Sequence, residues 1–580
     1  MTRLFNDPAR FTDDMVTGFA AAHPEHVRAV PGGVVRASRP GTAKVAVLTG
    51  GGSGHYPAFC GVVGPGFADG SVIGNVFTSP SAAQAHSVAT EAESGAGVLF
   101  LFGNYAGDVM NFGQAAQRLT GEGIPARCFA VTDDIASATG GSDEERAKRR
   151  GIAGGFVVFK NASAAAEEGA SLEEVVRVAE HTNARTRTLG VAFAGCTLPG
   201  QGEPLFTVPE GRLGLGLGIH GEPGVSESEL TSAEDLARTL VEGLLAERPA
   251  EAAGNRVAVL LNGLGATKYE ELYVLWASVS RLLAEAGLEL VRPEVGELVT
   301  SLDMAGCSLT LTWLDDELER LWLAPADTPS YRRGEVAPQE PAVAARVPEP
   351  RAATAARTEV PTASGSAVAV SAAAVRALRA AHTLLHDQEE RLGRLDAVAG
   401  DGDHGRGMCK GVDAALAAAE RAHAANAAPA ALLGAAGDAW AAEAGGTSGA
   451  LWGAGLRAAG SALPADRAAE PAELAAAARA ALEAVTGLGK AAPGDKTLVD
   501  ALDPFVTAFH GRIAEGAGAA ESFATAAGVA RTAAEATAEL RPRLGRARPL
   551  AERSVGTADP GATSLAMVLD EVATALATDV

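Results

Sequence analysis

The stretch Lys44–His55 reads KVAVLTGGGSGH, and it sets the fold class of the first half of the chain. Lys44–Thr49 is a short apolar run of the kind that forms a buried strand. The run ends at three consecutive glycines, which let a backbone turn sharply and approach a small ligand closely. The stretch therefore predicts a strand whose carboxyl end carries a binding loop.

Further runs of strand length recur along the first half, with helical patterns between several of them. We predict strands over Val98–Phe102, Ala126–Thr132, Phe156–Lys160, Leu189–Ala194, Arg256–Leu261 and Ser308–Trp313. We predict helices over Ser81–Glu93 and Leu172–His181. Strands that alternate with helices favour an α/β fold with a mostly parallel sheet.

The composition changes near residue 325, where a proline-rich segment with little apolar periodicity begins. Beyond it the chain is rich in Ala, Leu, Glu and Arg, which favours helices. We expect them over Ala372–Leu392, Ala430–Ala444, Pro471–Val485 and Ala519–Leu540. The sequence thus predicts two α/β subdomains over 1–324 that divide near residue 183, a Pro/Ala-rich linker over 325–367, and an all-α domain over 368–580.

Composition also excludes several classes of protein. The net charge of −23 argues against a nucleic-acid binder, and the short basic cluster Arg146–Arg150 is expected to be a solvated helix face. The five cysteines lie far apart without a CxxC pair, which is typical of a reducing cytosol and predicts neither disulfides nor a cysteine-based zinc site. Met1–Arg10 lacks the apolar core of a signal peptide, and no apolar stretch reaches about 18 residues. We therefore expect a cytoplasmic protein.

Two glycine-rich motifs match nucleotide-binding signatures as strings but not in context. Gly216-x-Gly218-x-x-Gly221 is followed by Glu222-Pro223-Gly224, which cannot open the helix that a dinucleotide fingerprint requires. Gly489–Thr497 resembles a P-loop, but it has one residue too many before the lysine and follows an Ala-rich helix. A loop with Asp, Lys and Thr could still contact a nucleotide in another fold.

The strongest local signal is the sequence DAVAGDGDHG over Asp396–Gly405. Its three carboxylates, Asp396, Asp401 and Asp403, are interleaved with glycines that allow the side chains to converge. Oxygen ligands with open positions left over suit Mg²⁺ and phosphate. An ordinary acidic turn between helices is the alternative, and the spacing is not that of an EF-hand.

Other loops offer phosphate contacts or small-ligand contacts. In the second half, Gly445–Gly449 (GGTSG) precedes a helix and could cradle phosphate at its N-terminus, and Gly556–Ala562 is a similar break. In the first half, Ser53 and His55, and then Asn104–Asp108 (NYAGD), follow predicted strands, where open α/β sheets bind ligands. His220 is flanked by small residues and accessible. Each of these loops could instead serve as a simple turn or a satisfied structural contact.

In this order the motifs resemble those of the dihydroxyacetone kinase family, in its single-chain ATP-dependent form that includes the erythrulose kinase branch. The stretches that carry the resemblance are Gly50–His55, Phe77–Pro80, Asn104–Asp108, Asn111–Gly113, Gly214–Gly224, Asn262–Thr267, Thr300–Gly306, Gly400–Gly405, Gly445–Gly449, Pro493–Thr497 and Asp559–Ala562. They cover nearly the whole chain. The resemblance implies an α/β ketose-binding region joined by a linker to an all-helical nucleotide-binding barrel, and a homodimer.

The resemblance also implies roles for residues of the first half. His220 would hold the ketone carbon as a hemiaminal, Asp108 would accept the proton of the attacking hydroxyl, and His55 would assist and orient. The implied ketose-binding residues are Gly52, Ser53, Gly54, His55 and Asp108.

For the second half, the resemblance implies that Asp396, Asp401 and Asp403 hold two Mg²⁺ ions beside ATP. The implied nucleotide-binding residues are Asp401, Gly402, Asp403, His404, Thr447, Ser448, Gly487, Gly494, Asp495, Gly556, Thr557 and Ala558. Together these residues would support phosphoryl transfer, in which catalysis is mainly positioning and charge neutralisation.

Three departures from the family pattern lie beside the implied sugar site. Tyr56 replaces a usual Glu, Gly103 a usual Lys, and Val109-Met110 a usual Arg-Leu. Because charge and shape change there, we expect a four-carbon ketose, D- or L-erythrulose, to be preferred to dihydroxyacetone, with Tyr56 as a possible hydrogen-bond donor. Two other functions stay open: cyclisation of a flavin dinucleotide (FAD-AMP lyase activity) by the helical domain, and a non-catalytic ketose-sensing partner of a regulator. Metal-dependent ATP use that rises with added ketose would separate the three.

Overall fold

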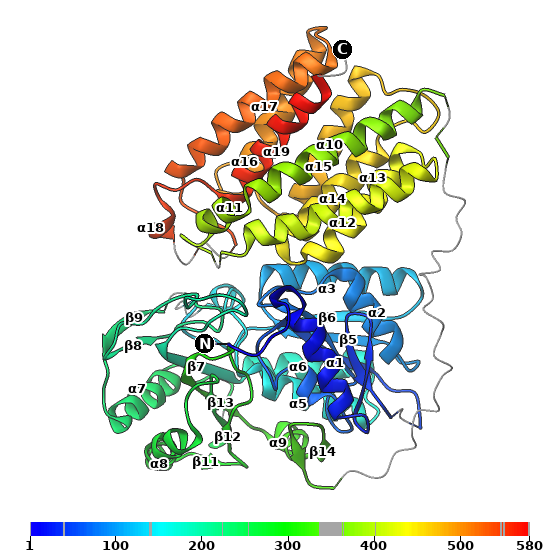
Figure 1. The fold of residues 1–580 in the computed structure, drawn as a ribbon. Coiled ribbons are helices and arrows are strands. Elements are labelled where there is room, and N and C mark those ends of the chain that lie inside the picture. Colours follow the sequence, from blue (N-terminus) through cyan, green and yellow to red (C-terminus); the bar gives the residue numbers. More distant parts are fainter. Residues whose placement is uncertain are drawn as a thin grey trace. The chain divides into compact units, whose positions relative to one another are not determined.

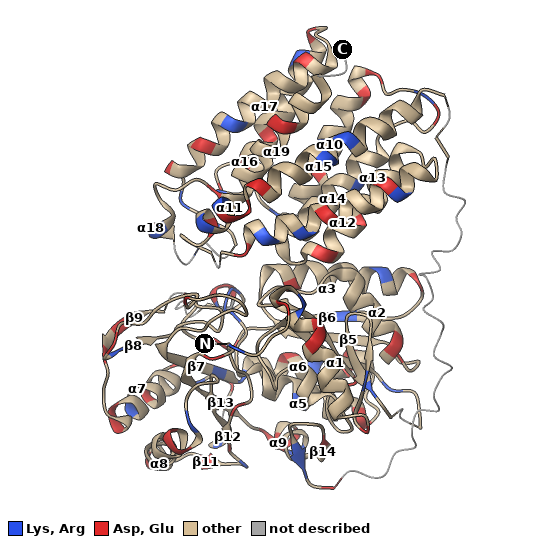
Figure 2. Ribbon diagram, in the orientation of Figure 1, with Lys and Arg blue, Asp and Glu red and all other residues tan. Residues whose placement is uncertain are grey.

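The chain forms two compact units, Met1–Ala345 and Arg346–Val580, in a computed structural model (Figure 1). The structure describes residues 2–38, 41–138, 142–222, 224–252, 254–335, 362–363, 365–400, 402–545, 548 and 551–577. Within these residues the first unit combines sheets and helices and the second is helical, which confirms the predicted fold class. Figure 2 shows acidic and basic residues interspersed over both units.

The first sheet contains β3, the strand predicted over Lys44–Thr49. Its order is β1-β2-β4-β3-β5-β6, with bounds Val27–Val30, Gly33–Arg36, Gly70–Val76, Ala46–Ser53, Val98–Gly103 and Ala126–Val131. The strands β4, β3, β5 and β6 run parallel, so the carboxyl ends of β3 and β5 lie at the same edge. The helices beside this sheet are α1 (Phe11–Ala22), α2 (Ala82–Ala92), α3 (Ala106–Gly121), α5 (Gly155–Glu167) and α6 (Leu172–Ala184).

The second sheet differs from the prediction of a mostly parallel sheet. Its order is β11-β10-β13-β7-β8-β9, and β12 also pairs with β10. The bounds are β7 (Thr186–Ala194), β8 (Arg212–Leu215), β9 (Ser226–Glu229), β10 (Arg256–Gly263), β11 (Glu289–Leu290), β12 (Glu294–Gly296) and β13 (Ala305–Trp313). Strand β13 runs antiparallel to both β7 and β10. The prediction is therefore right for the centre of the first sheet and wrong for this one.

Helices α7 (Ala233–Ala246) and α8 (Tyr269–Glu285) pack on the second sheet around its own apolar core. Short elements complete the unit: α4 (Asp143–Arg146), α9 (Asp316–Leu323), and the hairpin of β14 (Ala326–Asp327) and β15 (Arg332–Arg333). This hairpin falls where the composition predicts the start of the linker, and Ala326, Tyr331 and Arg333 are buried in it. Residues 336–361, most of the predicted linker, lie outside the described residues.

The predicted strand Phe156–Lys160 is wrong, because these residues lie within helix α5. Residues 155–166 are buried at every position. A helix buried on all sides has no polar face, so its apolar run carries no helical period and cannot be told from a buried strand. The alanines that continue the run, at 162 and 164–166, are the feature that favours a helix.

The second unit is a closed arrangement of helices. They are α10 (Ala367–Asp387), α11 (Glu389–Asp396), α12 (His404–Ala424), α13 (Pro429–Ala444), α14 (Gly446–Ser461), α15 (Pro471–Gly489), α16 (Val499–Ala514), α17 (Ala519–Ala536), α18 (Ala551–Ser554) and α19 (Pro560–Ala577). The predicted helix Ala372–Leu392 is interrupted at Gln388, between α10 and α11. Helix α10 packs against both α12 and α19, which brings the two ends of this unit together.

Helix α10 is long and apolar enough to pass a test for a membrane span, although the sequence predicted none. Val375, Leu378, Ala381 and Leu385 of this helix are buried in a core shared with α12, α13 and α19. Its apolar face is thus used within the helical unit.

Candidate functional site

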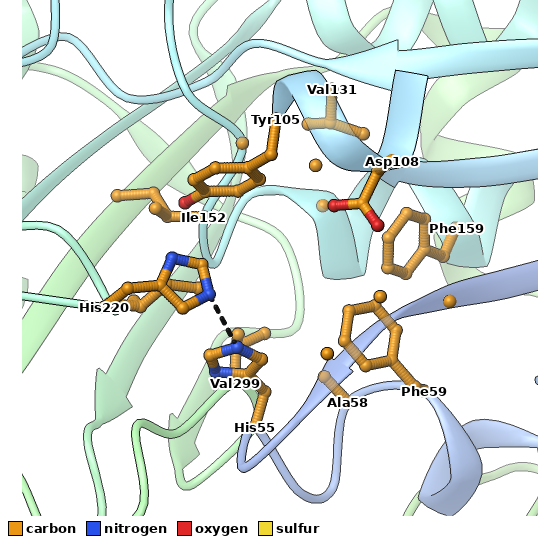
Figure 3. Close-up of a pocket in the computed structure, with 17 residues that line it drawn as sticks. His55, Ala58, Phe59, Tyr105, Asp108, Val131, Ile152, Phe159, His220 and Val299 are labelled. Atoms are coloured by element: carbon orange, nitrogen blue, oxygen red, sulfur yellow. Dashed lines mark hydrogen bonds between the residues drawn. The ribbon is translucent and has the colours of Figure 1, made fainter. Parts of the chain in front are cut away.

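A cavity with about 450 Å³ of empty space, part of it open to solvent, lies at the carboxyl ends of β3 and β5 in the first unit. Its walls come from both sheets, because the loop after β8 and the segment before β13 also reach it. Glycines form much of the lining, at Gly50, Gly51, Gly52, Gly103, Gly151 and Gly155. Figure 3 shows His55, Tyr105, Asp108 and His220 on its walls.

The structure brings some of the predicted ketose-binding residues together and turns others away. His55, Asp108, His220 and Gly52 line the cavity, with Asp108 in the first turn of α3. Ser53 does not line it, and its hydroxyl lies 3.0 Å from that of Thr12. Gly54 supports the loop: its φ of +103° suits glycine, and a Cβ there would meet the Phe77 ring at 2.7 Å.

His55 is held as a neutral imidazole. Its Nδ1 lies 2.7 Å from the carbonyl oxygen of Thr300, which can only accept, so this nitrogen carries the proton. Burial lowers the pKa of His55 to about 3, and the neighbouring charge of His220 contributes. A neutral ring has one proton, so Nε2 of His55 is an acceptor.

His220 is held through both ring nitrogens. Its Nε2 lies 3.0 Å from Nε2 of His55, drawn as the dashed line in Figure 3. Its Nδ1 lies 2.9 Å from a carboxylate oxygen of Glu222. Both contacts are hydrogen bonds when the His220 ring carries two protons. In that state, Nε2 of His220 has to give up its proton before it can act as a nucleophile.

Sequence reasoning missed the chain of charges behind His220. Glu222 also accepts the backbone N–H of His220 at 3.0 Å and lies 3.8 Å from Arg150, which in turn pairs with Asp134 at 2.7 Å. Burial by itself would raise the pKa of the Glu222 carboxyl, but His220 and Arg150 hold it well below its usual range. The expected solvated face is wrong for Arg149 and Arg150, which are buried in ion pairs.

Of the three departures from the family pattern, Gly103 is the one that lines the cavity. Tyr56 and Val109 are each 45% exposed, and the ring of Tyr56 packs edge-on against Phe19. The tyrosine at the cavity is Tyr105, whose ring centroid lies 4.8 Å from that of His220. A Cβ at Gly103 would meet the Tyr105 ring at 2.8 Å and the Gly151 carbonyl oxygen at 2.9 Å, so glycine there sets the position of Tyr105.

The acidic loop of the second unit connects α11 to α12. Asp396 ends α11, and its carboxylate accepts the N–H of Gly402 at 2.9 Å. Asp403 caps α12, and Nε2 of His404 lies 2.9 Å from the Ser564 hydroxyl of α19. Asp401 lies outside the described residues.

The remaining predicted nucleotide-binding residues lie at other helix ends of this unit. Gly445 and Gly446, with φ near +60°, join α13 to α14, and Thr447 and Ser448 follow in the first turn of α14. The N–H of Gly494 donates to Asp500 at 2.5 Å, and Asp495 accepts the N–H of Ala492. Gly487 is in the last turn of α15. Gly556, Thr557 and Ala558 lead to α19.

The charge distribution at these loops suits a cation. Burial, together with the negative charges of Asp500 and Asp396, raises the pKa of Asp559 to about 7. The ammonium of Lys496 offsets part of this charge, but it donates to the carbonyl oxygens of Leu540 and Ser554. Clustered carboxylates that repel one another are a donor set for which Mg²⁺ is well fitted.

Comparison with known proteins agrees with both halves of this description. Residues 17–330 match the Dak1 domain and residues 398–574 the DAK2 domain. Over 99% of its length the chain is 60% identical to the D-erythrulose kinase of Mycolicibacterium smegmatis, and it covers 98% of that protein. It is 52% identical to the L-erythrulose kinase of Pectobacterium atrosepticum, over 100% of this chain and 97% of that one. The dihydroxyacetone kinase of C. freundii, crystallised with AMP-PNP and Mg²⁺, is 30% identical over 99% of both chains, with a TM-score of 0.50.

Proposed function

The chain belongs to the dihydroxyacetone kinase family and is an ATP-dependent ketose kinase, and we propose that its substrate is erythrulose, phosphorylated at a terminal hydroxyl. The observation that carries this proposal is the glycine-lined cavity whose lining includes both an imidazole, His220, and a carboxylate, Asp108. The two relatives above, at 60% and 52% identity, are named for D- and L-erythrulose. Gly103 carries no charge at the cavity wall and, because it has no side chain, lets the Tyr105 ring lie against it.

We propose that His220 holds the ketose as a hemiaminal. The proton on Nε2 of His220, which is hydrogen-bonded to Nε2 of His55 3.0 Å away, moves to the carbonyl oxygen as the freed nitrogen attacks the ketone carbon. The carbonyl oxygen becomes a hydroxyl, and His55 guides the proton without holding it as a free imidazolium, because the pKa of His55 is only about 3. No proton enters or leaves the site in this sequence, and Glu222 balances the positive charge of the substituted ring throughout.

Asp108 is the proposed acceptor for the proton of the terminal hydroxyl as this oxygen attacks the phosphate. Its carboxylate is buried at the cavity wall, where little water is present to compete with it for that proton. In the second unit, Asp396, Asp401 and Asp403 would hold Mg²⁺, which when bound neutralises the phosphate charge of ATP. The glycine-bearing helix ends beside them would supply backbone N–H groups to the phosphates.

The test of substrate choice is a side-by-side measurement of kcat/KM for D-erythrulose, L-erythrulose and dihydroxyacetone. We expect one erythrulose enantiomer to exceed dihydroxyacetone by about 10- to 200-fold, the scale for one small group in a pocket. A clear preference for dihydroxyacetone would reject erythrulose as the substrate and leave the ketose kinase assignment standing.

The test of covalent capture uses the His220→Ala variant and intact-protein mass spectrometry of the ketose complex. Wild type should gain the mass of one ketose, and the variant should not. The variant should also lose discrimination against glycerol, because a polyol has no carbonyl with which to form the adduct. His86→Ala, a histidine of the same unit paired with Glu122, is the matched control. A crystal structure with a clear van der Waals gap between His220 and the ketone carbon would refute the adduct.

A further inference from the structure

Two histidines and an aspartate converge on the helical unit outside the loops described above. His382 and His386 are one turn apart on α10, and Asp413 is on α12. Nε2 of His382 lies 2.9 Å from Oδ1 of Asp413, and Nε2 of His386 lies 2.7 Å from the same oxygen. We propose that these three side chains form a binding site for Zn²⁺ or another divalent transition-metal ion.

The backbone holds these ligands on a rigid support. An i, i+4 spacing places two histidines on the same side of a helix, and their ring centroids are 4.6 Å apart. Leu378 and Leu385 of α10 and Val412 of α12 are buried in one shared core, which fixes the two helices against each other. Ligands on packed helices lose little freedom when an ion binds.

The distances fit a tetrahedral ion after a small adjustment. Zn²⁺ with ligands at about 2.1 Å sets its donor atoms about 3.4 Å apart. The three donor atoms here all lie within 4.8 Å of one another, and the two nitrogen–oxygen distances are slightly shorter than the tetrahedral value. All three side chains are partly exposed, at 36%, 41% and 50%, so an ion can enter and water can fill the fourth position.

The ligand chemistry separates this site from the acidic loop. Imidazole nitrogens favour Zn²⁺, Cu²⁺, Ni²⁺ and Co²⁺, whereas Mg²⁺ prefers oxygen ligands. Asp413 is ten residues beyond Asp403 on the same helix, which is about 15 Å along its axis. An ion at Asp413 would therefore not reach phosphates bound at Asp403. It would link α10 to α12, the helix that begins at the acidic loop.

A second trio, His386, Glu389 and Cys409, shares one histidine with this site. The Cys409 thiol is buried and donates to the carbonyl oxygen of Leu385 at 3.4 Å. This thiol is already engaged by a main-chain carbonyl and is shielded from solvent, whereas the donor groups of His382, His386 and Asp413 are partly exposed. The proposal therefore rests on the trio with Asp413.

The experiment is a titration of the full-length protein, freed of metals with EDTA and exchanged into excess Mg²⁺, with Zn²⁺ followed by isothermal calorimetry. The excess Mg²⁺ occupies the all-oxygen sites. We expect Asp413→Asn, and separately the double variant His382→Ala/His386→Ala, to abolish the binding of one equivalent of Zn²⁺ or to lower its affinity by about 100-fold or more. Loss of a group that only supports a metal ligand already lowers metal affinity by about 10- to 100-fold. Co²⁺ should give the visible absorption of a tetrahedral site in wild type and not in these variants.

His510→Ala is the matched control, because this histidine is also exposed on a helix of the same unit. It should keep the full Zn²⁺ stoichiometry. Another candidate cluster lies in the first unit and consists of His23, Glu25 and His26. All variants retain it, so the test depends on the difference of one Zn²⁺ equivalent between wild type and variant. Circular dichroism of the metal-free variants checks that they are folded. An unchanged Zn²⁺ stoichiometry and affinity in Asp413→Asn and in the double variant would overturn the proposal.

Discussion

The cavity of the first unit and the acidic loops of the second treat charge in opposite ways. Behind the cavity, the ionisable groups next to His220 are paired: Glu222 lies between His220 and Arg150, and Arg150 also pairs with Asp134. In the helical unit, burial together with the negative charges of Asp500 and Asp396 raises the pKa of Asp559 to about 7. The network around His220 is electrostatically complete from the chain alone, whereas the acidic loops have an excess of negative charge that a cation would relieve.

This difference teaches how each region should respond to substitution. A complete network is preorganised, so breaking one link leaves a buried charge without its partner. Removal of one carboxylate from the acidic cluster should weaken binding of the metal ion and so reduce activity. The same change relieves repulsion between carboxylates, so the protein itself can become more stable. Four variants test these opposite responses, and they follow from the largest expected effect to the smallest.

Asp396→Asn should have the largest effect, a loss of kcat of about 10³-fold or more, because phosphoryl transfer depends on charge neutralisation by the metal. Asn is the same size and can still accept the N–H of Gly402, so the loop should keep its shape. Ketose binding in the other unit should be unchanged, which calorimetry with erythrulose would check.

Asp438→Asn is the control for that loss, because Asp438 is an exposed aspartate of the same unit paired with Arg457. Its kcat should equal that of wild type. Full turnover of Asp396→Asn at saturating Mg²⁺ would contradict the assignment of the acidic loop to the metal.

Glu222→Gln comes next, with an expected loss of kcat/KM of about 10- to 100-fold, the equivalent of one hydrogen bond to a charged group. The amide can still contact His220, but it no longer balances the charged ring or Arg150. The adduct detected by mass spectrometry should become less abundant. Hydrolysis of ATP by the helical unit without ketose should be unaffected, and a fall in that rate as well would point to misfolding.

The two regions also differ in how far the sequence predicts them. The binding loops were found because each glycine run follows a strand or precedes a helix, as at Gly50–Gly52 after β3. The motif around His220 and the DAVAGDGDHG stretch are local patterns, so their chemistry could be read from the sequence. The helical half was predicted well, since most of its helices have an apolar stripe and separate starts.

Contacts between residues that are distant along the chain could not be predicted from the sequence. Glu222 is far along the chain from Asp134 and Arg150, and it meets Arg150 because the loop after β8 lies beside the end of the first sheet. Arg150 lies in a run of charges that is typical of an exposed helix, so its burial had no local signal. Tyr56 stands out in the sequence because it departs from the family pattern, but the tyrosine at the cavity is Tyr105, and only the fold decides which ring lies there.

Gly103→Ala tests the shape of the cavity in the first unit. The new methyl group would lie 2.8 Å from the Tyr105 ring, which must move. We expect the ratio of kcat/KM for erythrulose over that for dihydroxyacetone to fall by about 10-fold. Gly113→Ala on α3 is the matched control, since a methyl group there meets no atom within 4 Å. An unchanged ratio in Gly103→Ala would show that Gly103 does not set the choice of ketose.

Asp559→Asn should give the smallest effect and the one of opposite sign, a gain in stability. An unfolded aspartate titrates near pH 3.9, while the pKa of Asp559 in the fold is raised to about 7. The folded chain therefore holds this proton more tightly, and the ionised carboxyl lowers the stability of the helical unit increasingly as the pH rises from about 4 to about 7.

The Asn side chain keeps a carbonyl oxygen to accept the N–H of Ala562, so the start of α19 stays capped. Without Mg²⁺, the melting temperature of the variant should exceed that of wild type by roughly 5 °C at pH 7.5 and by less at pH 5. Scanning calorimetry would measure both values, and adding Mg²⁺ with AMP-PNP identifies the transition of the helical unit. Because bound Mg²⁺ relieves the same repulsion in wild type, it should reduce the difference in melting temperature between variant and wild type at pH 7.5. A difference between variant and wild type that is the same at both pH values would mean that Asp559 is not the strained charge, and that the contrast between the two regions lies elsewhere.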